Sequence, residues 1–389
     1  MKRVTPSAGW KRQGLLALLT GDGAAEHAFI ERVLLLRSER YPVMLTGAAD
    51  ASREFARYTP AIARSGNLFH EFAEPEELFG MARPAPVVAA ASLSALPDLR
   101  EIAGRFPGVA TAFYVRHASQ GEALQQATRP GGALEGMWLY SDSVWLCETL
   151  RTEHGLAAAA VAPGVDRRIH VPPDAHRGIG PASIVAIMDE KGGAAERTAR
   201  LLAALADRFG PAVTLNVIGS RTKRRGTRTR ARQTADRWNG RFELSRAALA
   251  NLLQQADIYV DLSDRAETPG LGLTAMACGC AAALPKEGAA GSFANHLRDA
   301  LLLDTTDYES CWLSITALVE DRGLRERLQA AAATRAATFD AASAAQSDQT
   351  FFIAISLARL AASTGGRGVG PPMTGTSHDP GTRVTRKTR

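Results

Sequence analysis

The stretch NLLQQADIYVDLSDRAETPGLGLTAMACG, residues 251–279, contains the order of elements that decides the fold. Apolar residues at helical spacing in NLLQQA predict a short helix, and the alternation in IYVDL, residues 258–262, predicts a strand. The segment Glu267–Gly279 then places a Pro-Gly turn before small apolar residues that suit a tightly packed helix. Helix, strand, glycine turn and helix in this order are typical of an open α/β sheet.

The glycine turn follows the carboxyl end of the predicted strand. Backbone N–H groups and the positive end of the helix dipole converge at such a point, so that it suits a phosphate group. The alternative is that Gly270 and Gly272 only turn the chain, because a lone glycine pair is a weak motif. The rest of the sequence has to decide between these two interpretations.

Short apolar runs alternate with helix-compatible stretches along the 389 residues, a length that suits two domains. Residues 14–20, 42–46 and 86–93 are such runs, which predicts a mainly parallel sheet covered by helices. The pattern breaks into Pro, Gly and charged residues at 161–181 and restarts at the strand-like IVAIM. We therefore predict an α/β protein with two Rossmann-like doubly wound domains. The predicted segments are an N-terminal domain (1–168), an interdomain linker (169–181), a C-terminal domain (182–340), a C-terminal helix (341–362, apolar from about Asp348) and a disordered basic tail (363–389).

The composition is that of an ordinary globular protein, with 46% apolar and 22% charged residues. No uninterrupted apolar run approaches ~18 residues and no charged-then-apolar leader opens the chain, so we expect a cytoplasmic protein. The cysteines lack the spacing of common zinc sites, and we interpret them as small buried thiols in a reducing compartment and expect no metal site. They are Cys147, Cys278, Cys280 and Cys311.

The net charge of +6 is concentrated in two segments. The run RTKRRGTRTRAR, Arg221–Arg232, has seven cations and no acid, and residues 363–389 add five cations and one acid. A solvated loop is the first interpretation of the run. Contact with anionic lipid is the second, and it places the protein peripherally on the inner face of the membrane. Nucleic acid ranks last, because no aromatic side chains are interleaved with the cations.

Four strings carry a family resemblance. SDSVWLCETLRTEHGLAAAAVAPGVDRRIHVPP begins at Ser141, and ASIVAIMDEKGGAAERTARLLAALADRFGPAVTLNVIGS begins at Ala182. ADIYVDLSDRAETPGLGLTAMACGCAAALPKEG and ALLLDTTDYESCWLSITALVEDRGLRERLQAAA follow in order. Together, over about Ser141 to Phe352, they resemble the family-four, or group 1, glycosyltransferases of the GT-B fold. The resemblance implies two Rossmann-like domains that face each other across a cleft.

The resemblance also implies an activity. Such enzymes transfer a sugar from a nucleotide-sugar donor with retention and without a metal, and the N-terminal domain binds the acceptor. FYVRHASQGE, residues 113–122, is similar to the acceptor-side stretch of the branch that builds rhamnose-rich and other surface polysaccharides. The implied partners are a nucleotide sugar and a glycan or lipid-linked acceptor. Because the donor is a substrate, no cofactor is expected.

Fixed cations and helix N-termini have to stabilise the leaving diphosphate in a metal-independent enzyme of this kind. The family places an Arg and a Lys after the first strand of the second domain, and IMDEKGG is the matching stretch. Lys191 and Gly192 match, but Asp189 stands at the position of the arginine. The resemblance therefore implies a catalytic role for Lys191 and a donor-binding role for Gly192.

The donor-site signature of the family has two glutamates eight positions apart, one near the sugar and one on the ribose. The first matches Glu267 with a one-residue slip, and the second falls on Thr274. A threonine can accept one ribose hydrogen bond but cannot provide the bidentate grip of a carboxylate. The N–H groups of Gly272 and Leu273 remain available to the phosphates. The implied donor-binding set is Gly270, Leu271, Gly272, Leu273 and Thr274.

His117 ends the predicted strand ATAFYVRH, residues 110–117, where the family often places a histidine near the sugar or the acceptor. A single histidine is otherwise structural or exposed, so both interpretations stay open. Arg116 is the alternative partner for an anionic acceptor. Since alternation along a strand sends neighbours to opposite faces, we expect only one of the two to face the cleft.

The substituted donor-site residues leave two alternatives to an active transferase. A degenerate GT-B domain that serves as a binding partner in polysaccharide assembly is favoured by Asp189 and Thr274. A nucleotide-sugar epimerase on the same fold is the other alternative, and the linker pattern suits a transferase better.

Overall fold

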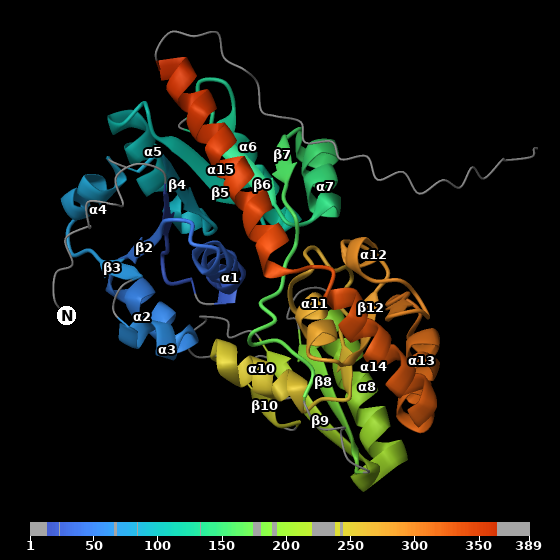
Figure 1. The fold of residues 1–389 in the computed structure, drawn as a ribbon. Coiled ribbons are helices and arrows are strands. Elements are labelled where there is room, and N and C mark those ends of the chain that lie inside the picture. Colours follow the sequence, from blue (N-terminus) through green and yellow to red (C-terminus); the bar gives the residue numbers. More distant parts are fainter. Residues whose placement is uncertain are drawn as a thin grey trace, which may run out of the picture.

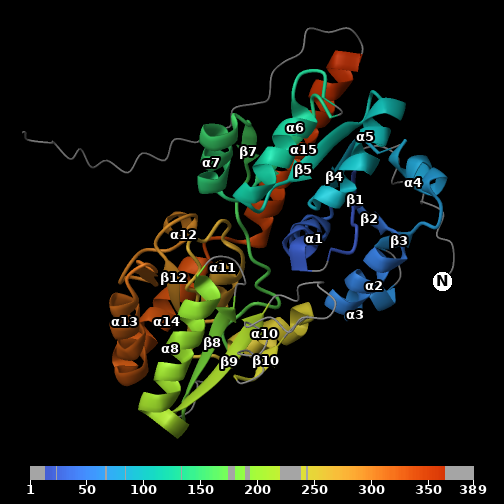
Figure 2. The ribbon, with the colours of Figure 1, turned by 180° about the vertical axis from the view of Figure 1, so that it is seen from behind.

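The structure is a computed structural model that describes residues 14–22, 24–65, 68–83, 85–132, 134–173, 180–188, 193–219, 238–241 and 244–363. The described residues form two parallel sheets with helices packed around them (Figure 1). Figure 2 shows the same two halves from behind. The chain therefore folds into two α/β domains.

The first sheet has the strand order β3-β2-β1-β4-β5-β6-β7, with parallel neighbours. Its strands are β1 (Leu15–Leu18), β2 (Val43–Gly47), β3 (Phe69–Glu71), β4 (Val87–Ala90), β5 (Ala110–Tyr114), β6 (Trp138–Ser141) and β7 (Ala158–Ala160). Its helices are α1 (Ala24–Ser38), α2 (Ala49–Tyr58), α3 (Pro60–Ser65), α4 (Pro75–Ala82), α5 (Leu96–Arg105), α6 (Gly121–Thr128) and α7 (Val144–His154), with short 3-10 helices η2 (Leu93–Ala95) and η3 (Ala118–Gln120). The strand order reverses between β1 and β4, which is where doubly wound sheets bind ligands.

The second sheet repeats this plan, with the strand order β10-β9-β8-β11-β12-β13. Its strands are β8 (Ala182–Met188), β9 (Val213–Gly219), β10 (Gly240–Arg241), β11 (Ile258–Val260), β12 (Ala281–Pro285) and β13 (Leu301–Leu303). Its helices are α8 (Ala194–Phe209), α10 (Arg246–Gln254), α11 (Gly270–Ala277), α12 (Ala290–Phe293), α13 (Tyr308–Glu320) and α14 (Arg322–Ala336), with the 3-10 helix η4 (Gly210–Ala212). The order reverses between β8 and β11, so the glycine turn after β11 lies at the switch point.

The central strands of both sheets are buried on two sides, which explains why they are short apolar runs. In β1, Leu15 and Ala17 pack into the core cluster on one face, whereas Leu16 and Leu18 pack into the cluster on the other. Successive side chains of a strand point to opposite faces of the sheet. A strand that is covered on both faces is therefore apolar at every position instead of alternating.

The last helix, α15 (Ala341–Ser363), follows the second domain in the chain but packs on the first (Figures 1 and 2). The rings of Phe351 and Phe352 lie against Tyr140 of β6, with ring centroids 4.8 Å and 5.5 Å from that of Tyr140. All three residues belong to the core cluster that also contains β1 and α1. The C-terminal helix is thus part of the N-terminal domain.

The cysteines are all buried, which confirms their interpretation as small buried thiols. Burial raises the pKa of Cys147 to about 12 and that of Cys311 to about 11. Both thiols therefore stay protonated at neutral pH, and a protonated thiol is a poor nucleophile and a poor metal ligand.

Candidate functional site

One contact between the two domains is made where the residues after β5 meet the residues after β11. Glu267 accepts a hydrogen bond from the backbone N–H of Ala118 at 2.8 Å, and the same oxygen, Oε2, lies 3.3 Å from Nδ1 of His117. The side chains of His117 and Glu267 are 39% and 24% exposed, so solutes can reach this contact. We call these three residues the domain junction. It unites two of the side chains that the sequence analysis selected from opposite domains.

Glu267 is held in place by its preceding residue. Ala266 forms a parallel bridge with Gly288, which lies in the loop between β12 and α12. The N–H of Ala266 donates to the carbonyl of Glu287 at 3.1 Å, and the carbonyl of Ala266 accepts from the N–H of Ala289 at 2.5 Å. This short ladder fixes the backbone beside the carboxylate at the edge of the second domain.

Gly288→Ala is expected to break this support and to lower the free energy of unfolding by roughly 2–4 kcal/mol. Gly288 has a φ of +93°, and a Cβ at this position would lie 2.1 Å from the carbonyl oxygen of Ala266. Urea unfolding measures the loss. Gly291→Ala is the matched control in α12, because nothing lies within 4 Å of a Cβ there. Equal stability of the two variants would contradict the prediction.

The strand that leads to His117 is shorter than predicted. β5 ends at Tyr114, and His117 is the N-cap of η3. The side-chain oxygen of Gln120 accepts hydrogen bonds from the N–H groups of Arg116 and His117, at 2.9 Å and 3.1 Å. The predicted strand over residues 110–117 is therefore three residues too long, because the chain has left the sheet before Arg116. Strand alternation thus gives no reason to separate the two side chains, and the expectation that only one of them faces the cleft stays a prediction.

Arg116 lies beside the junction in a cluster of polar groups. Burial lowers the pKa of its guanidinium, and its electrostatic interactions with Tyr114, Asp142, Tyr58 and Glu267 oppose that shift. The cluster therefore brings a buried cation close to the carboxylate of the junction.

A second arginine approaches the junction from the other domain. The guanidinium of Arg265 lies over the ring of Trp145 in α7, 5.6 Å from its centroid. Neither Arg265 nor the N–H group of Ala118 was predicted from the sequence. Arg265 could have been suggested by its position two residues before Glu267 in the sequence. The backbone N–H of Ala118 could not, because every residue except proline has one.

The glycine turn forms the first turn of α11. Gly270 has a φ of +31°, which an L side chain rarely adopts. The N–H groups of Gly270, Leu271 and Gly272 lack acceptors inside the helix, as the first N–H groups of any helix do. The N–H of Leu273 instead donates to the carbonyl of Pro269 at 3.1 Å. The expectation that Leu273 offers its N–H to a phosphate is wrong, because the helix has already begun and uses that group.

The small size of Gly272 also has a packing reason. A Cβ there would lie 3.1 Å from Leu284 and 3.2 Å from Phe293. The absence of a side chain therefore lets α11 approach β12 and α12 closely. Gly270 and Gly272 let the chain turn and pack closely, which is the structural interpretation. They also leave backbone N–H groups without helical acceptors at the end of β11, which is the phosphate-binding interpretation.

Thr274 follows one turn later on α11. Its hydroxyl donates a hydrogen bond to the carbonyl of Gly270 at 3.0 Å. The hydroxyl oxygen can still accept a hydrogen bond, but its only donor is used within the helix. Thr274 can therefore accept one hydrogen bond from a ribose hydroxyl but cannot donate one to it.

Lys191, Gly192 and Asp189 lie outside the described residues, as does the basic run Arg221–Arg232. The strand before Lys191, β8, pairs directly with β11 in parallel. Because the carboxyl ends of neighbouring parallel strands lie at one edge of a sheet, the end of β8 at Met188 lies at the same edge as the end of β11, which leads to Glu267.

Arg197 of α8 confirms that the start of this helix lies next to the chain after β11. Its Nη2 atom donates to the carbonyl of Leu262 at 2.9 Å, and the guanidinium also contacts Asp264. Arg197 was not predicted from the sequence as a site residue. The available signal was its position one turn into α8, close along the chain to the stretch after β8 where the resembled family places its two cations.

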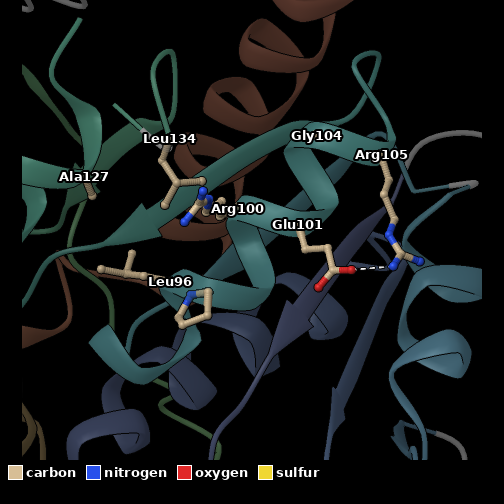
Figure 3. Close-up of a pocket in the computed structure, with 8 residues that line it drawn as sticks. Leu96, Arg100, Glu101, Gly104, Arg105, Ala127 and Leu134 are labelled. Atoms are coloured by element: carbon tan, nitrogen blue, oxygen red, sulfur yellow. Dashed lines mark hydrogen bonds and ion pairs between the residues drawn. The ribbon is translucent and has the colours of Figure 1, made fainter. Parts of the chain in front are cut away.

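A pocket of about 640 Å³ lies elsewhere, on the outside of the first domain beside α5 (Figure 3). Arg105 and Glu101 form an ion pair in its wall, and Arg100, Ala127 and Leu134 also line it. None of the predicted site residues lines this pocket. It is therefore separate from the domain junction.

Two further properties concern only the described part of the chain. No group of three or more His, Cys, Asp or Glu side chains there could hold a metal ion. None of its helices combines the length and the apolar character that crossing a membrane requires.

The sequence of the second domain matches a known family. The family described as Glycosyl transferases group 1 matches residues 194–335. This match begins at the first turn of α8 and ends in α14, so it includes Glu267 and the glycine turn. No curated protein sequence matches the chain significantly.

Solved structures resemble both domains together. A glycosyltransferase from Rickettsia africae has a TM-score of 0.64 at 11% identity, over 89% of this chain and 98% of that chain. Anabaena HepE in complex with UDP-glucose has a TM-score of 0.65 at 14% identity, over 86% and 97%. Sucrose-phosphate synthase from Thermosynechococcus elongatus has a TM-score of 0.62 at 15% identity, over 87% and 98%. The chain thus has the GT-B fold with two Rossmann-like domains, which confirms the predicted fold class.

Proposed function

We propose that this protein is a retaining, metal-independent glycosyltransferase that moves a sugar from a nucleotide-sugar donor to a surface-glycan or lipid-linked acceptor. The observation that carries the proposal is the contact of His117 with Glu267 between the two domains of a GT-B fold. The match to the group 1 family supports the reaction type. The complexes of HepE with UDP and UDP-glucose support a nucleotide-sugar donor.

In this proposal the second domain binds the donor. The N–H groups of Gly270, Leu271 and Gly272 lie at the carboxyl end of β11 and stabilise the diphosphate together with the ammonium of Lys191. Thr274 accepts one hydrogen bond from the ribose. The positive end of the helix dipole and one fixed cation thus replace the divalent ion that other transferases use.

The junction places the sugar and the acceptor. Glu267 stabilises the positive charge that develops on the donor sugar as the bond to the diphosphate breaks. His117 lies on the acceptor side and binds the acceptor hydroxyl. The hydroxyls of the donor sugar replace the hydrogen bonds that Glu267 makes with Ala118 and His117, so that donor binding exchanges one set of contacts for another.

A second candidate is a degenerate GT-B domain that acts as a binding partner in polysaccharide assembly. The observation that favours it is the hydroxyl of Thr274, which is already bonded to Gly270 and carries no charge. Asp189 adds an anion where the family has a cation. This candidate binds neither the donor nor its nucleoside diphosphate.

Calorimetry with UDP, GDP and ADP separates the two candidates. We expect one of the three to bind the transferase with a Kd of roughly 10 μM to 1 mM, near the range of ordinary substrate affinities. Thr274→Glu should strengthen this binding by on the order of tenfold to a hundredfold, because a carboxylate grips both ribose hydroxyls.

Thr334→Glu is the matched control for that variant. Thr334 is an exposed helical threonine whose hydroxyl also donates four residues back, to the carbonyl of Ala330 at 2.9 Å. Its replacement should leave nucleotide binding unchanged. If no heat is seen at millimolar UDP, GDP and ADP, and Asp189→Arg with Thr274→Glu creates binding, the degenerate domain is the correct assignment.

A further inference from the structure

The C-terminal half of α15 presents an apolar stripe to solvent. Ile353, Leu357 and Leu360 are 44%, 61% and 54% exposed. Spacings of four and three residues place their side chains on one face of the helix. We call these three residues the α15 stripe. Contiguous exposed apolar residues of this kind mark interaction surfaces, whereas single ones do not.

The stripe lies opposite the face with which α15 packs on the first domain. Phe351, Phe352 and Ile355 of the same helix are buried in the core. In Figure 1 the helix crosses the near side of the first domain, and in Figure 2 it lies behind the sheet. The stripe therefore lines an outer surface of the molecule, away from the domain junction.

Negative charge is absent from this half of the helix. Between residues 349 and 363 the sequence has no Asp or Glu, and its one charged residue, Arg359, donates through Nε to the carbonyl of Pro107 at 2.8 Å. The sequence that follows the helix, residues 364–389, is cationic. Its charged residues are Arg367, Arg383, Arg386, Lys387 and Arg389 against Asp379.

We propose that the α15 stripe docks on an anionic phospholipid surface, with the helix lying in the plane of the interface and the following cationic segment adding attraction. An exposed apolar helix face without acids, continued by an excess of cations, has the two features that bind such a surface. The inference does not depend on the proposed function. It concerns residues other than the basic run Arg221–Arg232, which lies outside the described residues.

Two other occupants fit the observations less well. A second copy of the chain needs about 800 Å² of interface on each partner, which three side chains on one helix cannot supply. The segment 364–389 could fold back on the stripe, but its apolar residues Val369, Met373 and Val384 lack the spacing of a helix or strand face.

Sedimentation of the full chain with vesicles tests the proposal. We expect binding to vesicles of equal parts phosphatidylglycerol and phosphatidylcholine, and no binding to phosphatidylcholine alone. Leu357→Gln with Leu360→Gln should weaken binding by at least about thirtyfold, since two apolar side chains lose their burial. Deletion of residues 364–389 should weaken it at least about tenfold, because each cation near the surface adds about fivefold.

Leu313→Gln is the matched control, because Leu313 is a 66% exposed leucine on α13 of the other domain. Its vesicle binding should stay within about threefold of the parent, as a surface substitution away from the site should. The proposal fails if the parent ignores phosphatidylglycerol, or if Leu313→Gln weakens binding as much as the stripe variant. It also fails if the stripe variant binds normally while the deletion abolishes binding.

Light scattering completes the test. A dimer of the parent in the absence of vesicles, lost in the Leu357→Gln and Leu360→Gln variant, would assign the stripe to a second copy and overturn the lipid proposal. A monomer of both is the expected result. Calorimetry with the nucleotides on the stripe variant should match the parent, so that failure here and failure of the proposed function remain distinguishable.

Discussion

Glu267→Gln is expected to lower the rate of sugar transfer by roughly a hundredfold to a thousandfold. Glutamine keeps nearly the same shape and can still accept the hydrogen bond from the N–H of Ala118, which Glu267 receives at 2.8 Å. It offers no negative charge to the sugar as positive charge develops there. The measurement is kcat for transfer, or for slow donor hydrolysis, with the nucleotide sugar that calorimetry identifies.

Glu309→Gln provides the control for this variant. Glu309 is an exposed carboxylate on α13 with a loose ion pair, 3.9 Å from Arg200. Its loss should leave kcat within about twofold. Because His117 touches Glu267, His117→Ala combined with Glu267→Gln should lose less activity than the product of the single losses. A parental kcat for Glu267→Gln would remove this carboxylate from the reaction and refute the proposed mechanism.

Arg32→Met is expected to lower the free energy of unfolding by roughly 3–5 kcal/mol. Arg32 is buried in α1 and donates to Asp348 of α15 at 2.6 Å, to Asp142 at 3.3 Å and to the carbonyl of Ala162 at 3.1 Å. The variant leaves two carboxylates without their cation in the interior. Because Asp348 belongs to α15, the loss should also weaken the attachment of that helix to the first domain.

The deficit of this variant should depend on pH. Burial raises the pKa of Asp348 to about 6 even beside Arg32, from an ordinary value of 3.8. A carboxyl whose pKa is raised on folding stabilises the fold below its unfolded pKa, and this contribution is lost as the pH rises through the folded pKa. Without Arg32 the folded pKa rises further. The deficit should therefore be smaller at pH 5 than at pH 8.

Urea unfolding at the two pH values measures this difference. Arg151→Met is the control, because Arg151 forms an exposed pair with Glu148 within α7. It should cost at most about 0.5 kcal/mol at either pH. A deficit of Arg32→Met that is the same at pH 5 and pH 8 would show that lost packing, and not uncompensated charge, is its cause.

Much of the fold could be predicted because its signals are local. The apolar run 14–20 contains β1, and the predicted strand 258–262 contains β11. Both strands are apolar at successive positions because both faces of each are buried. The glycine turn at the switch point of the second sheet could also be predicted, because its Pro-Gly motif is local in the sequence. The roles of His117, Glu267 and Thr274 stay predictions that the experiments above test, and those of Lys191 and the other donor-binding residues stay predictions as well.

Errors arose where backbone hydrogen bonds decide the result. The side chain of Gln120 ends the chain's run along the sheet before Arg116, and the carbonyl of Pro269 takes the N–H of Leu273. Both bonds depend on where an element starts or ends within one residue. Residue spacing does not specify boundaries that finely.

The sequence by itself determined which segments become strands and helices, and that two sheets of the same plan follow one another. Only the tertiary structure decided that His117 and Glu267, 150 residues apart, share one contact, and that α15 returns to the first domain through Asp348 and Arg32. Periodicity reports the burial of a residue within its own element. Which distant element covers it depends on the placement of whole sheets, and that placement is set by all the buried contacts together.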